Sequence, residues 1–349
     1  MPYQPSATDF FQPRIWRRAL EQLPIPAQYI GDSIFPEEDV PGDKLQWPIY
    51  SSDNGMSPFV ALDQESPVMD EEEFTIMFAD LAYVREKFNL LEHDVRMLRE
   101  LGDLPVDGAI SSFIQNKQKN IARRMARLRR RVLARKEWMQ INCALGSISY
   151  VPNAQSGVKF ALTFPVVPHT AAPLWSDTAG SDPVKDFQDW TVNLDYNIGR
   201  MIIGRSDLLN LARNTKIRNA MFTQANNVPT TVSIQAAKTF FSEELGIQIT
   251  EYNARYSTRT FNGSTYTTTQ SRFLPNGKVI LLPEGERVGY FATAPSVYNN
   301  FANPGLFTWF DDPENGGGSR DPYVFSAGVG IYGFPVFEWP DRVHVSTVA

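Results

Sequence analysis

Three histidines and one cysteine are the residues of this sequence best suited to metal or nucleophilic chemistry. His93, His169 and His344 lie far apart along the chain, and Cys143 is the single cysteine. A zinc site needs several imidazole or thiolate ligands, and a disulfide needs a second cysteine within the chain. We therefore expect no metal site, no cofactor and no catalytic residue among them. Each histidine is expected to be an ordinary surface or core residue, and Cys143 a small buried one.

The remaining motifs also predict structure rather than catalysis. The stretch Gly328–Gly333 matches G-x-G-x-x-G, but Phe334-Pro335 follows it, whereas a dinucleotide-binding turn must open a helix. We predict a β segment there. The acids near Asp311 lack EF-hand spacing, which favours a loop over residues 303–322. No nucleophile elbow or P-loop is present. The sequence therefore predicts a protein that is not an enzyme.

The element around which the chain is organised is a long helix predicted over Ile110–Leu145. Ser111 and Ser112 can cap it, Gly146 can end it, and no proline or glycine interrupts it. Six apolar residues share one stripe: Ile114, Ile121, Met125, Leu128, Val132 and Met139. At 1.5 Å per residue such a helix is about 52 Å long, so we expect it to cross the whole molecule.

This helix also concentrates positive charge in a chain whose net charge is −6. No acid occurs between Lys117 and Glu137, and the candidate basic face comprises Lys117, Lys119, Arg123, Arg124, Arg127, Arg130, Arg131 and Arg135. These residues could form a plain solvated face, contact nucleic-acid phosphates, or meet acidic patches of a neighbouring subunit. A membrane-surface helix would need a larger apolar face. We also expect no signal peptide and no transmembrane helix.

The chain before the helix predicts an extended arm. Residues 1–67 hold ten of the 25 prolines, which block helix, although Phe11–Leu23 could form one short helix. Apolar residues between Tyr29 and Tyr50 are too frequent for a solvated linker, so we expect them to be buried against something else, such as another subunit. Lys44–Tyr50 and Glu73–Ala79 are predicted to be strands around a projecting loop. Leu81–Leu101 has helical spacing.

The chain after Gly146 predicts a mixed α+β region. Strands are expected over residues 148–152, 158–164, 166–168, 200–204, 247–260, 265–273, 278–283, 289–295, 323–337 and 342–348. Helices are expected over residues 184–196, 208–214, 217–224 and 233–245. The dipeptide Asn262-Gly263 between two strands is a strong hairpin signal.

These pieces, in this order, resemble the lambda-type major capsid protein family (major capsid protein E) of tailed bacteriophages, which has the HK97-like fold. The resemblance covers most of the chain from about Ala27. It is carried by Ile34-Phe35-Pro36, by Glu137–Gln140 at the helix end, by Arg200–Asn214 and by the run KVILLP at Lys278–Pro283.

The resemblance implies an HK97-like architecture. Its expected parts are an N-terminal arm (1–45), a projecting E-loop hairpin (46–80), a peripheral β-sheet domain (81–185) with spine helix 110–145, an axial domain (186–322) and return strands (323–349). Arm and loop would lie over neighbouring subunits, through Phe35, Trp47, Ile49, Tyr50 and Phe74.

The implied function is a major capsid protein that self-assembles into an icosahedral head shell around double-stranded DNA and rearranges from a procapsid. The implied partners are further copies in hexamers and pentamers, the portal, scaffold and decoration proteins, and packaged DNA. The implied location is the virion, after assembly in the bacterial cytoplasm, with no membrane. Two alternatives stay open: a nucleic-acid-binding oligomer using residues 117–136, and a carbohydrate-active or lectin-like protein using Trp175, Trp190 and Trp309.

Overall fold

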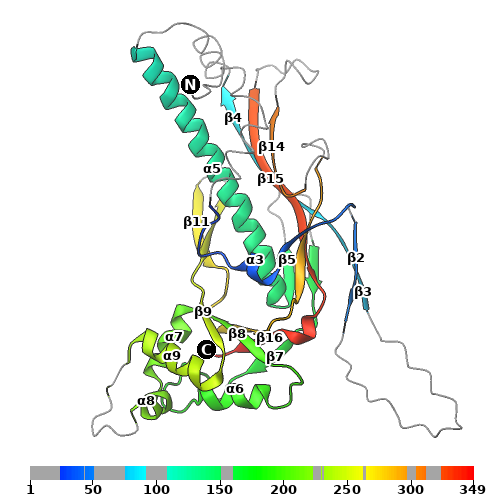
Figure 1. Cartoon of the computed structure of the whole chain (residues 1–349). Helices are drawn as coiled ribbons and strands as arrows, with labels where there is room; N and C mark the ends of the chain where they lie inside the picture. The colour runs from blue at the N-terminus through cyan, green and yellow to red at the C-terminus, as the bar shows by residue number, and fades with distance from the viewer. Residues whose placement is uncertain are drawn as a thin grey trace, which may run out of the picture.

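The described part of the molecule is built around one long helix and two five-stranded β-sheets in the computed structural model (Figure 1). The structure describes residues 24–42, 44–50, 75–91, 108–150, 160–222, 229, 232–261, 265–296, 304–311 and 324–349. Of these, the side chains of residues 90–91, 108–118, 160, 259–261, 266, 310–311 and 324–325 are left undescribed.

The predicted long helix is confirmed as α5, which runs from Gly108 to Ala144. Its 37 residues make it about 55 Å long. The apolar stripe is buried at Ile121, Met125, Leu128, Val132 and Met139, and the chain turns away at Gly146 with φ +87°. The stripe packs on the first sheet, so tertiary burial rather than propensity alone stabilises the helix.

The first sheet is built around β15 (Val324–Phe337), which pairs antiparallel with β4 (Ala82–Leu91), β13 (Gly289–Thr293) and β14 (Leu306–Asp311). The glycine-rich motif lies inside this strand, as predicted. A Cβ at Gly330 would lie 2.6 Å from Phe307 Cζ, and one at Gly328 would lie 2.5 Å from Trp309 Cε2. These glycines therefore let aromatic rings pack directly on the strand.

Two predictions within this sheet are wrong. Leu81–Leu101 was predicted to be helical, but β4 occupies Ala82–Leu91, and residues 92–101 lie outside the described residues. Burial alternates along it, with Val84, Glu86 and Phe88 half-buried and their neighbours exposed. The apolar residues of this short segment fit both the helical and the strand period. Its pairing with β15 at ten positions selects the strand. Strand β14 likewise replaces part of the predicted loop over residues 303–322.

The second sheet has the order β7-β16-β12-β8-β9 and its own hydrophobic core. Its strands are β7 (Val167–Thr170), β8 (Ile198–Ile203), β9 (Gln248–Glu251), β12 (Lys278–Pro283) and β16 (His344–Thr347). The accompanying helices are α6 (Pro183–Thr191), α7 (Arg205–Arg213), α8 (Thr215–Met221) and α9 (Ile234–Leu245), close to the predicted ranges. As expected, α9 ends at Gly246, whose φ is +67°.

Pairing across the chain departs from the domain boundaries expected from the sequence. Strand β16, expected among the peripheral return strands, pairs with β12 and β7 in the second sheet. Strands β13 and β14, expected in the axial domain, lie in the first sheet. Each of these three strands therefore pairs with a segment on the other side of an expected boundary.

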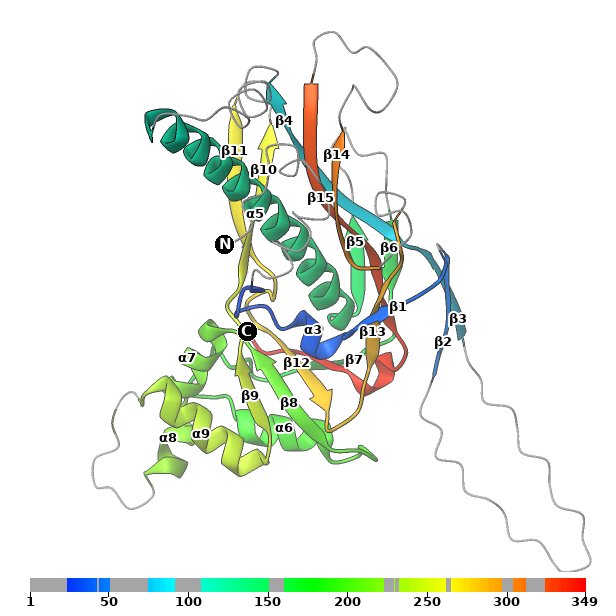
Figure 2. The same cartoon turned by 45° about the horizontal axis from the view of Figure 1, so that its top comes forward.

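The arm and two hairpins complete the fold (Figures 1 and 2). The arm contains helix α3 (Gly31–Ile34) and strand β1 (Glu37–Asp39), which pairs parallel with β13. Strands β2 (Lys44–Ile49) and β3 (Thr75–Asp80) form the predicted antiparallel hairpin, which stands away from the body. Strands β10 (Arg255–Phe261) and β11 (Tyr266–Arg272) form the other, while β5 (Ser147–Tyr150) pairs with β6 (Phe160–Thr163). The predicted helix Phe11–Leu23 lies outside the described residues.

Candidate functional site

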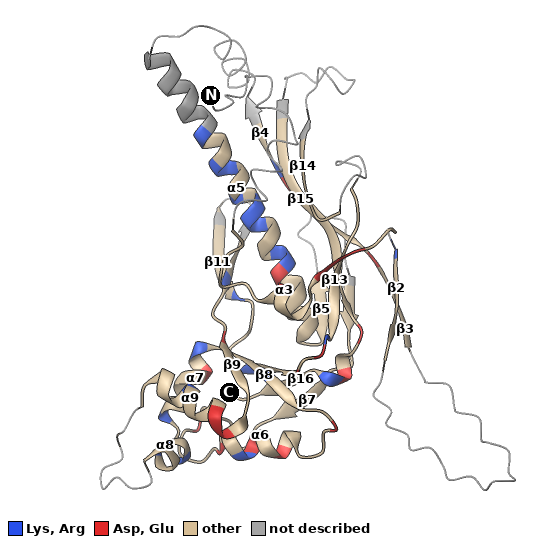
Figure 3. Ribbon diagram, in the orientation of Figure 1, with Lys and Arg blue, Asp and Glu red and all other residues tan. Residues whose placement is uncertain are grey.

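The basic residues of α5 fall into three groups around the helix axis. At about 100° per residue, Lys119, Arg123, Arg127 and Arg130 lie within a sector of about 80°, opposite the buried apolar stripe. A second group of three, Arg124, Arg131 and Arg135, lies between this sector and the apolar stripe on one side. A third group, Arg129 and Lys136, flanks the apolar stripe on the other side and is buried. Figure 3 shows the basic residues along α5.

The second group already has partners within the chain. Arg131 forms an ion pair with Glu86 of β4 at 2.5 Å between Nη1 and Oε1. The Arg124 guanidinium lies 5.8 Å from the centre of the Phe88 ring, and that of Arg135 lies 5.0 Å from the Trp138 ring and 5.1 Å from the Tyr150 ring. These side chains therefore help to hold the helix against β4 and β5.

The first group, which we call the free basic stripe, has no such partners among the described residues. Lys119, Arg123, Arg127 and Arg130 are exposed, and no side chain of the four forms a hydrogen bond or ion pair with another residue in the described part of the chain. Lys117 continues the helix toward its N-terminus, but its side chain is outside the described set. The stripe is thus a cationic surface open to a ligand of opposite charge.

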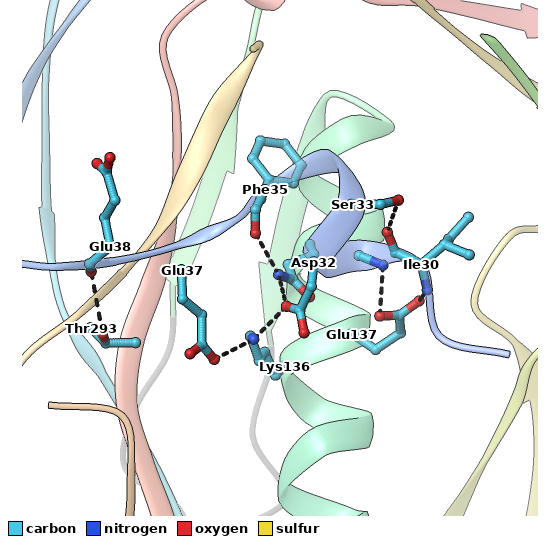
Figure 4. A network of polar contacts seen from close by, with 11 residues as sticks. Ile30, Asp32, Ser33, Phe35, Glu37, Glu38, Lys136, Glu137 and Thr293 are labelled. Carbon is cyan, nitrogen blue, oxygen red and sulfur yellow. Dashed lines mark hydrogen bonds and ion pairs between the residues drawn. The ribbon is translucent and has the colours of Figure 1, made fainter. Parts of the chain in front are cut away.

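The buried Lys136 has a different role, because it anchors the arm (Figure 4). Its side chain is 3% exposed and forms ion pairs with Asp32 of α3 and with Glu37 of β1, the latter at 2.5 Å. Its ammonium also lies 5.1 Å from the centre of the Phe291 ring. A lysine is rarely buried unless it is paired, and these two arm carboxylates supply the pairing.

Glu137, next along the helix, joins three parts of the chain. Its carboxylate accepts hydrogen bonds from the backbone N–H groups of Ile30 and Gly31, each at 3.0 Å, and from the Tyr252 hydroxyl at 2.6 Å. Tyr252 follows β9 of the second sheet. Burial raises the pKa of Glu137, and these three donors oppose that rise. One carboxylate therefore ties the arm to the helix and to the second sheet.

Gln140 completes this docking site one turn further along. Its amide donates to Asp32 Oδ1 at 2.9 Å and to the Phe35 carbonyl at 3.1 Å. A Cβ on Gly31 would lie 2.6 Å from Glu137 Oε2 and closer still to Gln140 Oε1. Only glycine lets the arm backbone come this near the helix.

The arm residues predicted to contact a neighbouring subunit are largely buried within their own chain. Phe35, Trp47 and Ile49 are 0%, 3% and 8% exposed. Trp47 donates from Nε1 to the Phe337 carbonyl at 3.0 Å, and Tyr50 stacks on Trp339 with ring centres 4.8 Å apart. Within the chain, β13 and the end of β15 therefore cover these residues, and their contact with a neighbouring subunit stays a prediction. Phe74 lies outside the described residues.

The opposite face of the β2–β3 hairpin leaves an apolar surface exposed. Phe78 is 66% exposed and Ile76 is 41% exposed, and Pro48 lies directly opposite Ile76 in the pairing register. Side chains alternate between the two faces of a strand, so burying Trp47 and Ile49 places Pro48 on the other face. We call Pro48, Ile76 and Phe78 the outer hairpin face.

No group of three or more metal-binding side chains occurs among the described residues. Two histidines nevertheless meet: His169 Nε2 lies 2.7 Å from His344 Nδ1, and His344 Nε2 lies 2.6 Å from the Tyr196 hydroxyl. Burial, assisted by the neighbouring His169 and opposed by Asp341, lowers the pKa of His344 to about 4. Cys143 is buried, as expected, and burial raises the pKa of its thiol.

The aromatic residues of the lectin-like alternative do not form an open platform. Trp175 is fully buried and Trp309 is 9% exposed. Trp190 stacks between His169 and Trp175, with ring centres at 5.3 Å and 6.1 Å. These rings serve internal packing.

Sequence reasoning missed the docking residues Lys136, Glu137 and Gln140 and the contact between the two histidines. One signal for the first was present: Glu137 is the acid that ends a run of bases, directly beside Lys136. The histidine contact had no such signal, because the two residues are 175 positions apart.

No α-helix described in the structure is both long and apolar enough to span a bilayer.

Two solved structures share the fold of this chain. One is a protein assigned as a prophage capsid protein of E. coli CFT073, with a TM-score of 0.51 and 15% identity over 79% of this chain and 80% of that chain. Another is a phage-related protein from Bordetella bronchiseptica RB50, with a TM-score of 0.50 and 14% identity over 99% of this chain and 98% of that chain. The fold is therefore α+β and HK97-like. No curated protein matches the chain by sequence.

The family comparison agrees with the fold. The model of the phage major capsid protein E family matches residues 17–305, which is most of the chain. The match includes α5, four of the five strands of the second sheet and strands β1, β4 and β13 of the first sheet. This chain belongs to the phage major capsid protein E family and is a shell-forming bacteriophage capsid protein.

Proposed function

We propose that copies of this chain assemble into a closed icosahedral head shell, built from hexamers and pentamers, which encloses a double-stranded DNA genome. The family match over residues 17–305 is the observation that carries this proposal. Shells of this kind gain stability from many modest contacts repeated by symmetry. We infer a structural role without catalysis, a place in the virion, and assembly in the bacterial cytoplasm from a procapsid.

The outer hairpin face is the surface we assign to contact with a neighbouring subunit. Phe78 and Ile76 are large apolar side chains exposed side by side on a hairpin that stands away from the body. Exposed apolar patches of this kind mark interaction surfaces. In this proposal Phe35, Trp47 and Ile49 act indirectly, because they fix the hairpin base to the end of β15.

The domain roles follow from the same proposal. We infer that α5 and the first sheet form the peripheral domain, that the second sheet and its helices form the axial domain, and that the hairpin is the E-loop. Portal, scaffold and decoration proteins are the further partners that a phage head requires.

Assembly of purified full-length protein tests the proposal, with particles followed by sedimentation and negative-stain electron microscopy. Wild type should form shells or capsomers. Phe78→Ser should reduce the shell fraction strongly, whereas Phe78→Leu, which keeps an apolar side chain, should preserve it. A wild-type protein that stays monomeric under all assembly conditions would refute the shell function. Shells formed equally well by Phe78→Ser would refute the assigned contact while leaving shell formation intact.

A further inference from the structure

We propose that the free basic stripe of α5, formed by Lys119, Arg123, Arg127 and Arg130, binds the phosphate backbone of double-stranded nucleic acid. The inference rests on the proposed function, because it names the partner of one surface of the shell subunit. It goes further by separating these four residues from the other basic residues of the same helix.

The stripe has the geometry of a linear cationic surface. Lys119 and Arg130 are eleven residues apart, so four positive charges are distributed along about 16 Å of the helix. A DNA duplex carries about ten negative charges over the same length. The sector faces directly away from Met125, Leu128 and the rest of the apolar stripe, so the side chains project from the side of the helix opposite the sheet.

The four charges are available because the described part of the chain does not pair them internally. Arg131 is balanced by Glu86 and Lys136 by two arm carboxylates, but no acid of the described residues pairs with Arg123, Arg127 or Arg130. The helix segment itself contains no acid from Lys117 to Lys136. In a chain of net charge −6, such an uncompensated stripe favours a partner of high negative charge density.

The composition of the stripe favours phosphate over an acidic protein segment. Protein interfaces have an apolar centre, whereas this sector offers cationic heads flanked by small or polar residues such as Asn120 and Ala126. No base-reading motif accompanies it, so binding should depend on charge and not on base sequence.

Two matched triple variants of the full-length protein test the inference. Arg123→Gln, Arg127→Gln and Arg130→Gln remove three charges from the free stripe. Arg124→Gln, Arg131→Gln and Arg135→Gln remove three charges from the partnered group on the same helix. Because both triples change the net charge equally, they differ only in the face that is altered. Binding to a duplex of fixed length is measured on unassembled protein between 50 and 200 mM salt.

We expect the stripe variant to lose affinity and the slope of log K against log salt to become shallower by roughly 2.7, since each lost phosphate contact removes about 0.9. The partnered-group variant should change the slope by less than half that amount. Equal effects of the two triples, or no effect of the stripe triple, would overturn the inference. The inference would also be overturned if the stripe variant bound DNA normally but lost binding to polyglutamate, which represents an acidic protein segment. Shell formation is scored separately by sedimentation, so a failure of assembly is distinguished from a failure of DNA binding.

Discussion

The contact between His169 and His344 predicts that acid destabilises the fold through one identifiable residue. His344 lies on β16 and is 1% exposed, and His169 lies on the paired strand β7. Their rings are parallel, with centres 5.0 Å apart, and one ring nitrogen donates to the other. Protonating both rings would place two donors and two positive charges face to face, which breaks this hydrogen bond.

The expected magnitude follows from the pKa of His344. Burial, assisted by the charge of His169 and opposed by Asp341, lowers this pKa from 6.5 to about 4. Between these values the unfolded chain binds a proton that the folded chain does not, so the free energy of unfolding falls as the pH falls. At about 1.4 kcal/mol per pKa unit, the total loss attributable to His344 is about 3 kcal/mol at pH 4.

Other charged groups face this contact and also titrate or respond to pH. Asp341 precedes β16, Asp195 lies near Tyr196, and Arg342 forms an ion pair with Glu286. The assay therefore compares wild type with His344→Gln, which cannot titrate there, instead of relying on wild type alone. Urea unfolding is measured at several pH values between 7.5 and 4, with both proteins in the same assembly state.

The variant should be less stable at pH 7.5, because Gln cannot bridge His169 and Tyr196 as the imidazole does. Its stability should nevertheless depend less on pH, so that the two curves converge by about 3 kcal/mol as the pH falls from 6.5 to 4. Curves that run parallel over this range would show that His344 is protonated equally in the folded and unfolded states, and would refute the reasoning.

Two further predictions concern the docking of the arm on α5. Gly31→Ala should destabilise the protein by about 1–3 kcal/mol in urea unfolding, because its Cβ would lie 2.6 Å from Glu137 Oε2. Gly42→Ala should be neutral, because its Cβ would lie 3.8 Å from the Lys44 carbonyl oxygen, an ordinary contact distance. Tyr252→Phe should lower the free energy of unfolding by about 1–3 kcal/mol and raise the pKa of Glu137 further, because a buried carboxylate loses a donor. Tyr256→Phe is the matched control and should change neither quantity. Loss of stability in either control equal to that of its test variant would contradict the assigned contacts.

The long helix was predictable because its evidence is local. An apolar stripe at helical spacing, an uninterrupted run of helix-forming residues and a final glycine all lie within one segment, and α5 spans nearly the predicted residues. The same holds for α9, for β12 and for the hairpin strands β10 and β11. Each of these has a boundary signal in its own sequence.

The helical prediction for Leu81–Leu101 failed because the decisive evidence is distant. Tyr83, Val84 and Phe88 fit a helix as well as a strand, and pairing with β15, more than 230 residues later, selects the strand. The buried face of the β2–β3 hairpin presents the same difficulty. Alternation shows that Trp47 and Ile49 share a face, but only the carbonyl of Phe337 shows that this face points inward.

The basic run of α5 could not be divided into its roles from the sequence for a related reason. The helical period assigns Arg123, Arg127 and Arg130 to one sector and Arg124, Arg131 and Arg135 to another, but it does not say which sector meets the protein. That distinction required Glu86 and Phe88 on β4, a segment predicted to be helical. Because β4 was predicted to be a helix, the sequence could not show which basic residues of α5 remain exposed.

Glu137 explains why the arm, α5 and the second sheet must be considered together. Moving the arm away from the helix would remove the N–H donors of Ile30 and Gly31 from a carboxylate that is 3% exposed, and would leave Lys136 without its two acids. Uncompensated buried charge costs several kcal/mol, so the arm cannot detach alone at low cost. The Tyr252 hydroxyl on the same carboxylate extends this constraint to the second sheet. A displacement of the arm during assembly would therefore have to be accompanied by solvation or repacking around Tyr252, and the Tyr252→Phe variant weakens this particular coupling.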